Sequence, residues 1–177
     1  LGVYPRIQMS RPTAKLLPFL RENGDKNYVY LYNCMYQDTE PETISIKVKG
    51  TGKPYALDCW SGEISEVPVY QQKNKRTIFE VTVAPGEALL FALDSSAEPE
   101  KHAVESNACD LRKSGCKTIA NFCESGRYTT IFSDNSTATV TVEVPDNIQL
   151  TNWQLKVEDW NEGEKKITEE NRGRGYV

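Results

Sequence analysis

Residues 52–63, Gly-Lys-Pro-Tyr-Ala-Leu-Asp-Cys-Trp-Ser-Gly-Glu, predict a β-strand that enters a tight turn and returns as a second strand toward Val69 and Tyr70. The turn falls near Gly62, which can take a positive φ because it has no Cβ. Ser61 beside it can hydrogen-bond to its own backbone, as serine often does in turns. A hairpin is therefore expected here, and the segments around it are expected to pack against it.

Those neighbouring segments alternate apolar and polar residues with the period of two that is typical of β-strands. Further strands are predicted at residues 28–32, 44–48, 79–83, 89–93, 117–122, 128–132, 139–144 and 153–158. In the first of them Val29 and Leu31 face away from three tyrosines, so both faces are expected to be covered. Helical spacing is absent. The sequence predicts an all-β, antiparallel β-sandwich of one or two small units, immunoglobulin-like or jelly-roll-like.

Four segments are expected along the chain. Residues 1–26 are predicted to be an irregular connector from an upstream domain, since Pro5, Pro12 and Pro18 interrupt any pattern and permit one helical turn at most. Residues 27–96 are predicted to be a β-sandwich unit. Residues 97–160 are predicted to form further antiparallel strands, in a second unit or a continuation of the same sandwich. Residues 161–177 are predicted to be a tail or the entry to another domain. The start at Leu1 suggests a processed chain or an excised segment.

Composition narrows the classes of function. Hydrophobic residues make up 38% of the sequence and charged residues 26%, which is typical of a soluble globular protein. The net charge of −4 leaves no basic face for a phosphate backbone, so nucleic acid is not an expected partner. No apolar run approaches the roughly 18 residues of a membrane span, so no membrane partner is expected either.

The cysteines leave the redox state open. Cys34, Cys59, Cys109, Cys116 and Cys123 are an odd number, so at least one is unpaired within the chain. Disulfides would fit an extracellular compartment, whereas buried free thiols are the alternative; the pairing is not predicted. The chain has a single histidine and no Cys-x-x-Cys pair, so neither a metal site nor a cofactor is expected.

The sequon Asn135-Ser136-Thr137 lies in a predicted turn, and Asn135 would carry a glycan if the protein is secreted. A chance sequon is the alternative.

Catalytic residues are not predicted. Asp58, Glu63 and Glu66 cluster on the hairpin, and a glycosidase needs two carboxyl groups about 5–10 Å apart. Strand tips commonly carry solvated charges, and this second interpretation is favoured. His102 lies in a polar stretch without a nucleophile motif and is predicted to be an ordinary surface residue.

Three aromatic residues are candidates for carbohydrate binding. The rings of Tyr55, Trp60 and Tyr70 could stack on the C–H faces of sugars while their polar edges form hydrogen bonds. For Trp60 the favoured alternative is a plug in the sandwich core. Trp153 belongs to an alternating apolar set and is predicted to be core, and Trp160 beyond it is a candidate for exposure.

Several motifs occur in a fixed order. A Tyr-rich strand at residues 28–33 precedes Gly-Lys-Pro-Tyr, Asp58 and Trp-Ser-Gly-Glu; Arg76-Thr77 and an apolar strand follow, and residues 150–160 read Leu-Thr-Asn-Trp-Gln-Leu-Lys-Val-Glu-Asp-Trp. This order resembles the β-sandwich behind the catalytic barrel in glycoside hydrolase family 106, the α-L-rhamnosidases, and is closest to secreted fungal members. Cys34 and Cys59 depart from the pattern, at positions where polar or small residues are expected.

The resemblance implies a non-catalytic accessory segment of a secreted, extracellular enzyme that acts on plant or microbial polysaccharide. Its partner would be the catalytic barrel of the parent chain, where the family's catalytic carboxylates lie; none of them can be placed on this sequence. The alternative is a carbohydrate-binding module with polysaccharide as its partner.

Overall fold

The computed structural model describes residues 4–97, 100–115, 117–146, 149, 151–159 and 166–172. Sixteen β-strands and no helix occur among them, which confirms the all-β prediction. The chain divides into two compact units, Leu1–Val144 and Pro145–Val177. No helix in the described ranges is long and apolar enough to span a membrane.

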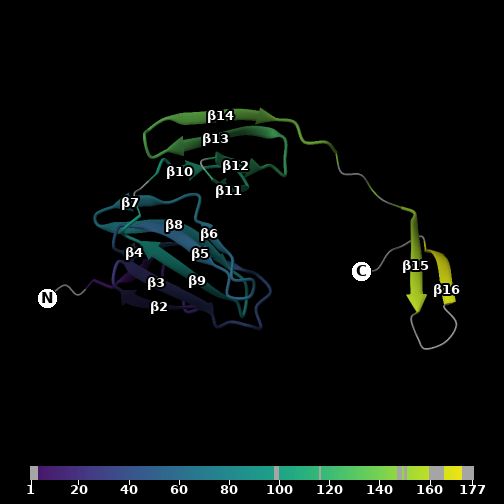
Figure 1. Cartoon of the computed structure of the whole chain (residues 1–177), viewed down its shortest axis with the longest axis horizontal. Coiled ribbons are helices and arrows are strands. Elements are labelled where there is room, and N and C mark those ends of the chain that lie inside the picture. The colour runs from purple at the N-terminus through teal and green to yellow at the C-terminus, as the bar shows by residue number, and fades with distance from the viewer. Residues whose placement is uncertain are drawn as a thin grey trace. The chain divides into compact units, whose positions relative to one another are not determined.

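Two antiparallel sheets form the sandwich in the first unit (Figure 1). The four-stranded sheet has the order β1 (Ile7–Met9), β4 (Glu42–Lys49), β8 (Arg76–Val83) and β7 (Gln71–Lys73). The five-stranded sheet has the order β2 (Leu16–Asn23), β3 (Lys26–Asn33), β9 (Ala88–Asp94), β5 (Lys53–Leu57) and β6 (Ile64–Glu66).

The core lies between these two sheets and follows the alternation of the sequence. In β4, Ile44, Ile46 and Val48 are at most 1% exposed, while their polar neighbours point away from the core. In β3, Val29 and Leu31 are fully buried. The predicted β-sandwich is therefore present, with the expected residues at its centre.

Residues 4–26 are more ordered than expected. The prediction of an irregular connector is wrong for β1 and β2, because β1 pairs with β4 and β2 pairs with β3 over its whole length. Pro18 is accommodated because β2 is an edge strand, where a missing N–H group breaks no second ladder. Leu16, only 3% exposed, joins β2 to the core.

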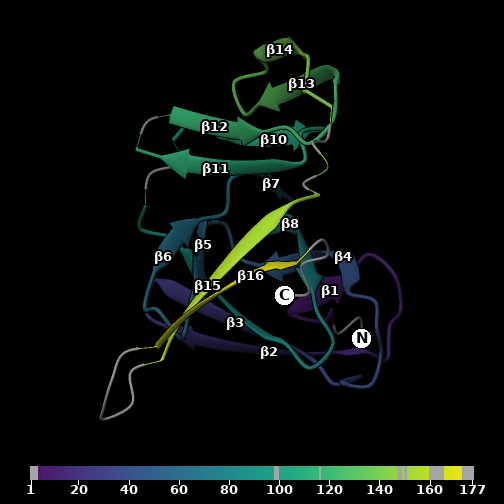
Figure 2. The ribbon, with the colours of Figure 1, turned by 90° about the vertical axis from the view of Figure 1, so that its right-hand side faces the viewer.

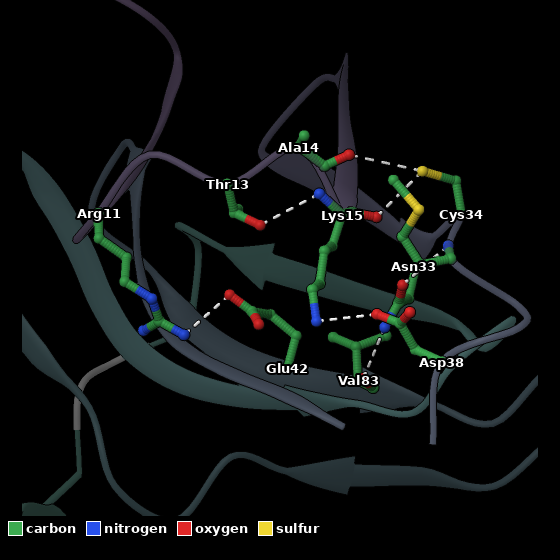
Figure 3. Close-up of polar contacts among 10 residues, drawn as sticks. Arg11, Thr13, Ala14, Lys15, Asn33, Cys34, Asp38, Glu42 and Val83 are labelled. Atoms are coloured by element: carbon green, nitrogen blue, oxygen red, sulfur yellow. Dashed lines mark hydrogen bonds and ion pairs between the residues drawn. The ribbon is translucent and has the colours of Figure 1, made fainter. Parts of the chain in front are cut away.

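Polar contacts hold this segment to the sandwich (Figure 3). Arg11 forms an ion pair with Glu42 at 2.8 Å, and Lys15 forms one with Asp38 at 2.8 Å. Asn33 is fully buried, and its amide donates to the carbonyl oxygen of Val83 at 3.1 Å, which ties the two sheets together.

The first unit continues with five more strands. β10 (Ala103–Ser106), β13 (Gly126–Phe132) and β14 (Thr137–Val142) form a three-stranded sheet, and β11 (Asp110–Ser114) pairs with β12 (Lys117–Asn121) as a hairpin. In Figures 1 and 2 these strands lie beyond the β7 end of the sandwich. The backbone N–H of Tyr70 donates to Ala103 at 3.0 Å and links the two parts.

In the described residues of the second unit, β15 (Trp153–Asp159) and β16 (Lys166–Arg172) pair as an antiparallel hairpin. Residues 166–172 are thus a strand within the predicted tail. Trp153 was expected in a core, but it is 49% exposed on this hairpin. Two paired strands cannot by themselves enclose a side chain. Trp160 lies outside the described residues.

Candidate functional site

The predicted hairpin exists, and its turn is fixed by the side chain of Asp58. Its carboxylate accepts hydrogen bonds from the N–H groups of Trp60 at 2.8 Å and Ser61 at 3.3 Å, and from the Ser61 hydroxyl at 2.6 Å. The bond from the Ser61 hydroxyl, followed by those from the two backbone groups, lowers the pKa of Asp58. Gly62 closes the turn with a φ of 75°, as its lack of a Cβ permits. Asp58 therefore acts as a turn residue.

Trp60 is fully exposed at this turn, so its interpretation as a core plug is wrong. The strands pair only as far as Leu57 and Ile64, so the turn residues between them project beyond the edge of the sheet. The indole ring lies on this projecting part, where the sandwich core cannot reach it.

Trp60 lines one end of a groove along an edge of the sandwich, here called the edge groove. Two adjoining cavities of about 640 and 670 Å³ share its five central residues, Ala56, Glu63, Ser65, Leu89 and Phe91. This lining combines the apolar side chains of Ala56, Leu89 and Phe91 with the carboxylate of Glu63 and the hydroxyl of Ser65. This combination can contact both the apolar faces and the hydroxyl groups of a sugar.

A second polar feature, the Lys53 cluster, consists of Lys53, Glu66, Tyr70, Glu100 and His102. The ammonium group of Lys53 lies 2.7 Å from a carboxylate oxygen of Glu66 and 3.7 Å from one of Glu100. Burial alone would lower the pKa of Lys53, but the hydrogen bond and the charge of Glu66 outweigh it, and the pKa is raised. Both carboxylates therefore share one cation.

Tyr70 and His102 are the two ring residues of the Lys53 cluster, and both are buried. Their rings stack with centroids 3.8 Å apart and an interplanar angle of 5°. His102 is only 7% exposed, so its prediction as a surface residue is wrong; its Nδ1 lies 2.8 Å from the carbonyl oxygen of Glu100. Burial raises the pKa of Tyr70 to about 12, and its hydroxyl has no hydrogen-bond partner among the described residues.

The three candidate sugar-binding rings therefore do not share one surface. Tyr70 is 3% exposed, Trp60 projects into solvent, and Tyr55 is half-buried beside a small outer pocket of about 230 Å³. Sequence reasoning placed all three on one hairpin but could not distinguish the two faces of its strands.

The outer face of the five-stranded sheet carries a feature that sequence reasoning missed. Phe19, Tyr30, Leu90, Leu57 and Ile64 pair in register across all five strands, and this set is here called the apolar row. Phe19 is 62% exposed, Tyr30 41% and Ile64 67%. A continuous apolar strip of this kind is typical of a surface that another body covers.

Asn135 lies in the turn between β13 and β14 and is exposed, with a φ of 62°. The turn is held by Asp134, which accepts the hydroxyl hydrogen bond of Ser136 at 2.6 Å and pairs with Lys101 at 2.9 Å. The sequon is therefore accessible to solvent.

No group of three or more His, Cys, Asp or Glu side chains is arranged to hold a metal ion within the described residues. Four cysteines there, Cys34, Cys59, Cys109 and Cys123, are free thiols. Cys116 lies outside the described residues.

No family model matches this chain, and no curated protein matches it. Among solved structures the chain is similar to a rhamnosidase from Novosphingobium sp. PP1Y, with 17% sequence identity and a TM-score of 0.46. The match covers 72% of this chain and 15% of the rhamnosidase chain. At this level of similarity the match assigns no family, and the resemblance to glycoside hydrolase family 106 stays a prediction.

Proposed function

We propose that this chain is a non-catalytic accessory β-sandwich of a secreted, α-L-rhamnosidase-like glycoside hydrolase that acts on plant or microbial polysaccharide. The main support for this proposal is the apolar row. Its residues Phe19, Tyr30 and Ile64 are solvent-exposed in the first unit, and an apolar strip of this kind is normally covered by another domain or protein. The occupant is the catalytic barrel of the parent polypeptide.

Two further observations support this proposal. The order of the Gly-Lys-Pro-Tyr, Trp-Ser-Gly-Glu and residue 150–160 motifs resembles that of family 106 accessory segments. Glu66 and Glu100 share the ammonium group of Lys53, which suits a structural role better than hydrolysis. Secretion and glycosylation at the exposed Asn135 belong to the same proposal.

The test uses the full-length polypeptide that contains this chain. We expect it to hydrolyse an aryl α-L-rhamnoside, and we expect the isolated chain to show no turnover. Hydrogen exchange across β2 and β3 should be slower in the full-length protein than in the isolated chain, because docking protects these strands. A full-length protein without rhamnosidase activity, or with equal exchange in the two forms, would contradict the proposal.

Phe19→Asp tests the docking surface directly. A charge placed in an apolar interface is expected to weaken docking by about 2 kcal/mol or more and to restore fast exchange in β3. Thr43→Asp adds the same charge at an exposed position of β4, on the other sheet, and should leave exchange unchanged. If both variants behave like the unmodified protein, the apolar row is not the docking surface.

A second candidate function is carbohydrate binding in the edge groove, favoured by the fully exposed ring of Trp60 at its end. Trp60→Ala is expected to weaken binding of an oligosaccharide about 10-fold or more, through loss of ring stacking. Calorimetry against a panel of plant and microbial oligosaccharides measures this effect. Trp153→Ala removes a half-exposed ring from the second unit and is the matched control. Equal loss in both variants would rule out the edge groove.

A further inference from the structure

Two cysteines flank the open end of the β11–β12 hairpin. Cys109 directly precedes β11, and Cys123 follows β12 by two residues. The outermost pair of the hairpin is Asp110 opposite Asn121, and the Asn121 amide donates to the Asp110 carboxylate at 2.7 Å. Continuing this register by one residue places Cys109 opposite Phe122, the neighbour of Cys123, so the two cysteines lie near the Cα separation of about 4.4–6.8 Å that a disulfide requires.

The electrostatics agree with this placement. The pKa of Cys123 is raised, and the thiol of Cys109 is the largest cause. Burial raises the pKa of Tyr128, and the sulfurs of Cys109 and Cys123 add to that effect. Phe122 and Tyr128 pack with ring centroids 4.5 Å apart and hold the segment that carries Cys123. Both cysteines are exposed, so a small oxidant can reach them.

The other two described thiols are placed differently. The Cys34 thiol, just after β3, donates to the carbonyl oxygen of Lys15, just before β2, at 3.3 Å. Cys59 lies on the projecting turn, where its sulfur is 4.0 Å from the carbonyl oxygen of Leu57. Neither contact involves a second sulfur.

We propose that Cys109 and Cys123 form a disulfide that closes the β11–β12 hairpin in an oxidising compartment. The oxidant is a low-molecular-weight disulfide such as oxidised glutathione. One cysteine thiolate attacks it, forms a mixed disulfide and releases one glutathione; the other cysteine thiolate then attacks the protein sulfur and releases the second. The two cysteines lose two electrons and two protons, and both are recovered in two glutathione thiols. The proposal is independent of the proposed function.

The disulfide would bear on the edge groove, because the same hairpin lines its far end through Leu111 and Ile119. Closing the open end of the hairpin restricts the unfolded states of its residues and so favours the paired conformation.

Peptide mapping of the intact chain tests the proposal. Trypsin cleaves after Lys and Arg, so the peptides 102–112, 114–117 and 118–127 carry Cys109, Cys116 and Cys123 separately. The chain is equilibrated with reduced and oxidised glutathione, blocked with N-ethylmaleimide at low pH, digested and analysed by mass spectrometry. We expect peptides 102–112 and 118–127 to be joined in most molecules, and Cys34 and Cys59 to be recovered alkylated or glutathionylated.

Single variants make the result decisive. Cys116→Ser should leave the cross-link intact, and Cys109→Ser should leave Cys123 alkylated or glutathionylated. The proposal is overturned if Cys116 is the cross-linked partner of either residue, or if Cys109 and Cys123 each carry glutathione separately in the unmodified chain. Separate glutathionylation of Cys109 and Cys123 would be seen in the unmodified chain, so this test does not depend on whether a variant folds.

Discussion

Replacing Leu31 by alanine is expected to lower the free energy of unfolding by about 3 kcal/mol. Leu31 is fully buried in β3, a central strand that pairs with β2 on one side and β9 on the other. Its side chain lies in the core between the two sheets, and truncation removes apolar contacts and leaves a cavity that rigid sheets fill only partly. Urea unfolding followed by far-ultraviolet circular dichroism measures the change.

Tyr30→Ala is the matched control, because Tyr30 is the preceding residue on the opposite face of the same strand. It is 41% exposed, so its truncation is expected to cost about 1 kcal/mol. The contrast depends only on which face each side chain occupies. Equal losses in the two variants would mean that the face of β3 assigned to the core is wrong.

The same alternation explains why the sandwich is predictable from sequence. Ile44, Ile46 and Val48 mark one face of β4 without ambiguity, because a slip of one residue would expose all three. The pattern fails where proline interrupts it: Pro18 hid β2, although an edge strand tolerates the missing N–H group. Short strands such as β1 and β7 carry too few residues to show any period.

The candidate site was less predictable, because it depends on long-range contacts. Lys53 and Glu66 belong to the predicted hairpin, but Glu100 is far from both in sequence, and nothing local indicates that it also meets the ammonium group of Lys53. His102 lies in a polar stretch, yet it is buried and its ring stacks on that of Tyr70, which is far away in sequence. The apolar row could not be predicted without the strand register, because its five residues come from five different strands. The tyrosines of residues 28–32 indicated only that the second face of β3 is not polar.

The exposure of Trp60 was mispredicted for a related reason. Aromatic residues beside tight turns are usually covered, but here the Asp58 hydrogen bonds hold a turn that extends past the last strand pair, Leu57 and Ile64. How far a hairpin turn projects beyond its sheet depends on which residue pair is the last in the ladder. The alternation of apolar and polar residues does not indicate that last pair.

Replacing Lys53 by methionine is the second prediction with a large effect. The lysine side chain is 9% exposed, and its removal leaves the carboxylates of Glu66 and Glu100 without their cation. Breaking a fully buried pair costs about 3–5 kcal/mol. Because the Glu66 side chain is 28% exposed and that of Glu100 is 59% exposed, solvent screens both, and we expect a loss of about 1–2 kcal/mol at neutral pH.

The pH dependence separates the charge of Lys53 from its packing. The pKa of Lys53 is raised in the folded chain above its ordinary value of 10.5. A group of this kind stabilises the fold fully below its unfolded pKa, and the contribution is lost as the pH rises through the folded pKa. The deficit of Lys53→Met should therefore be constant near neutral pH and shrink above pH 10.5. Urea midpoints of both proteins across this range measure it.

Tyr70→Phe provides the control, because it alters the same buried cluster without altering a charge pair. The Tyr70 hydroxyl has no hydrogen-bond partner among the described residues, so its removal should leave stability unchanged or raise it by about 1 kcal/mol. If Lys53→Met is as stable as the unmodified chain at neutral pH, the ion pairs do not stabilise the fold. If its deficit persists undiminished at alkaline pH, the loss comes from the packing of the lysine stem. Two results together assign the stabilisation to the charge of Lys53 between the two carboxylates. The stability deficit of Lys53→Met must shrink as the lysine of the unmodified chain loses its proton, and Tyr70→Phe must be no less stable than the unmodified chain.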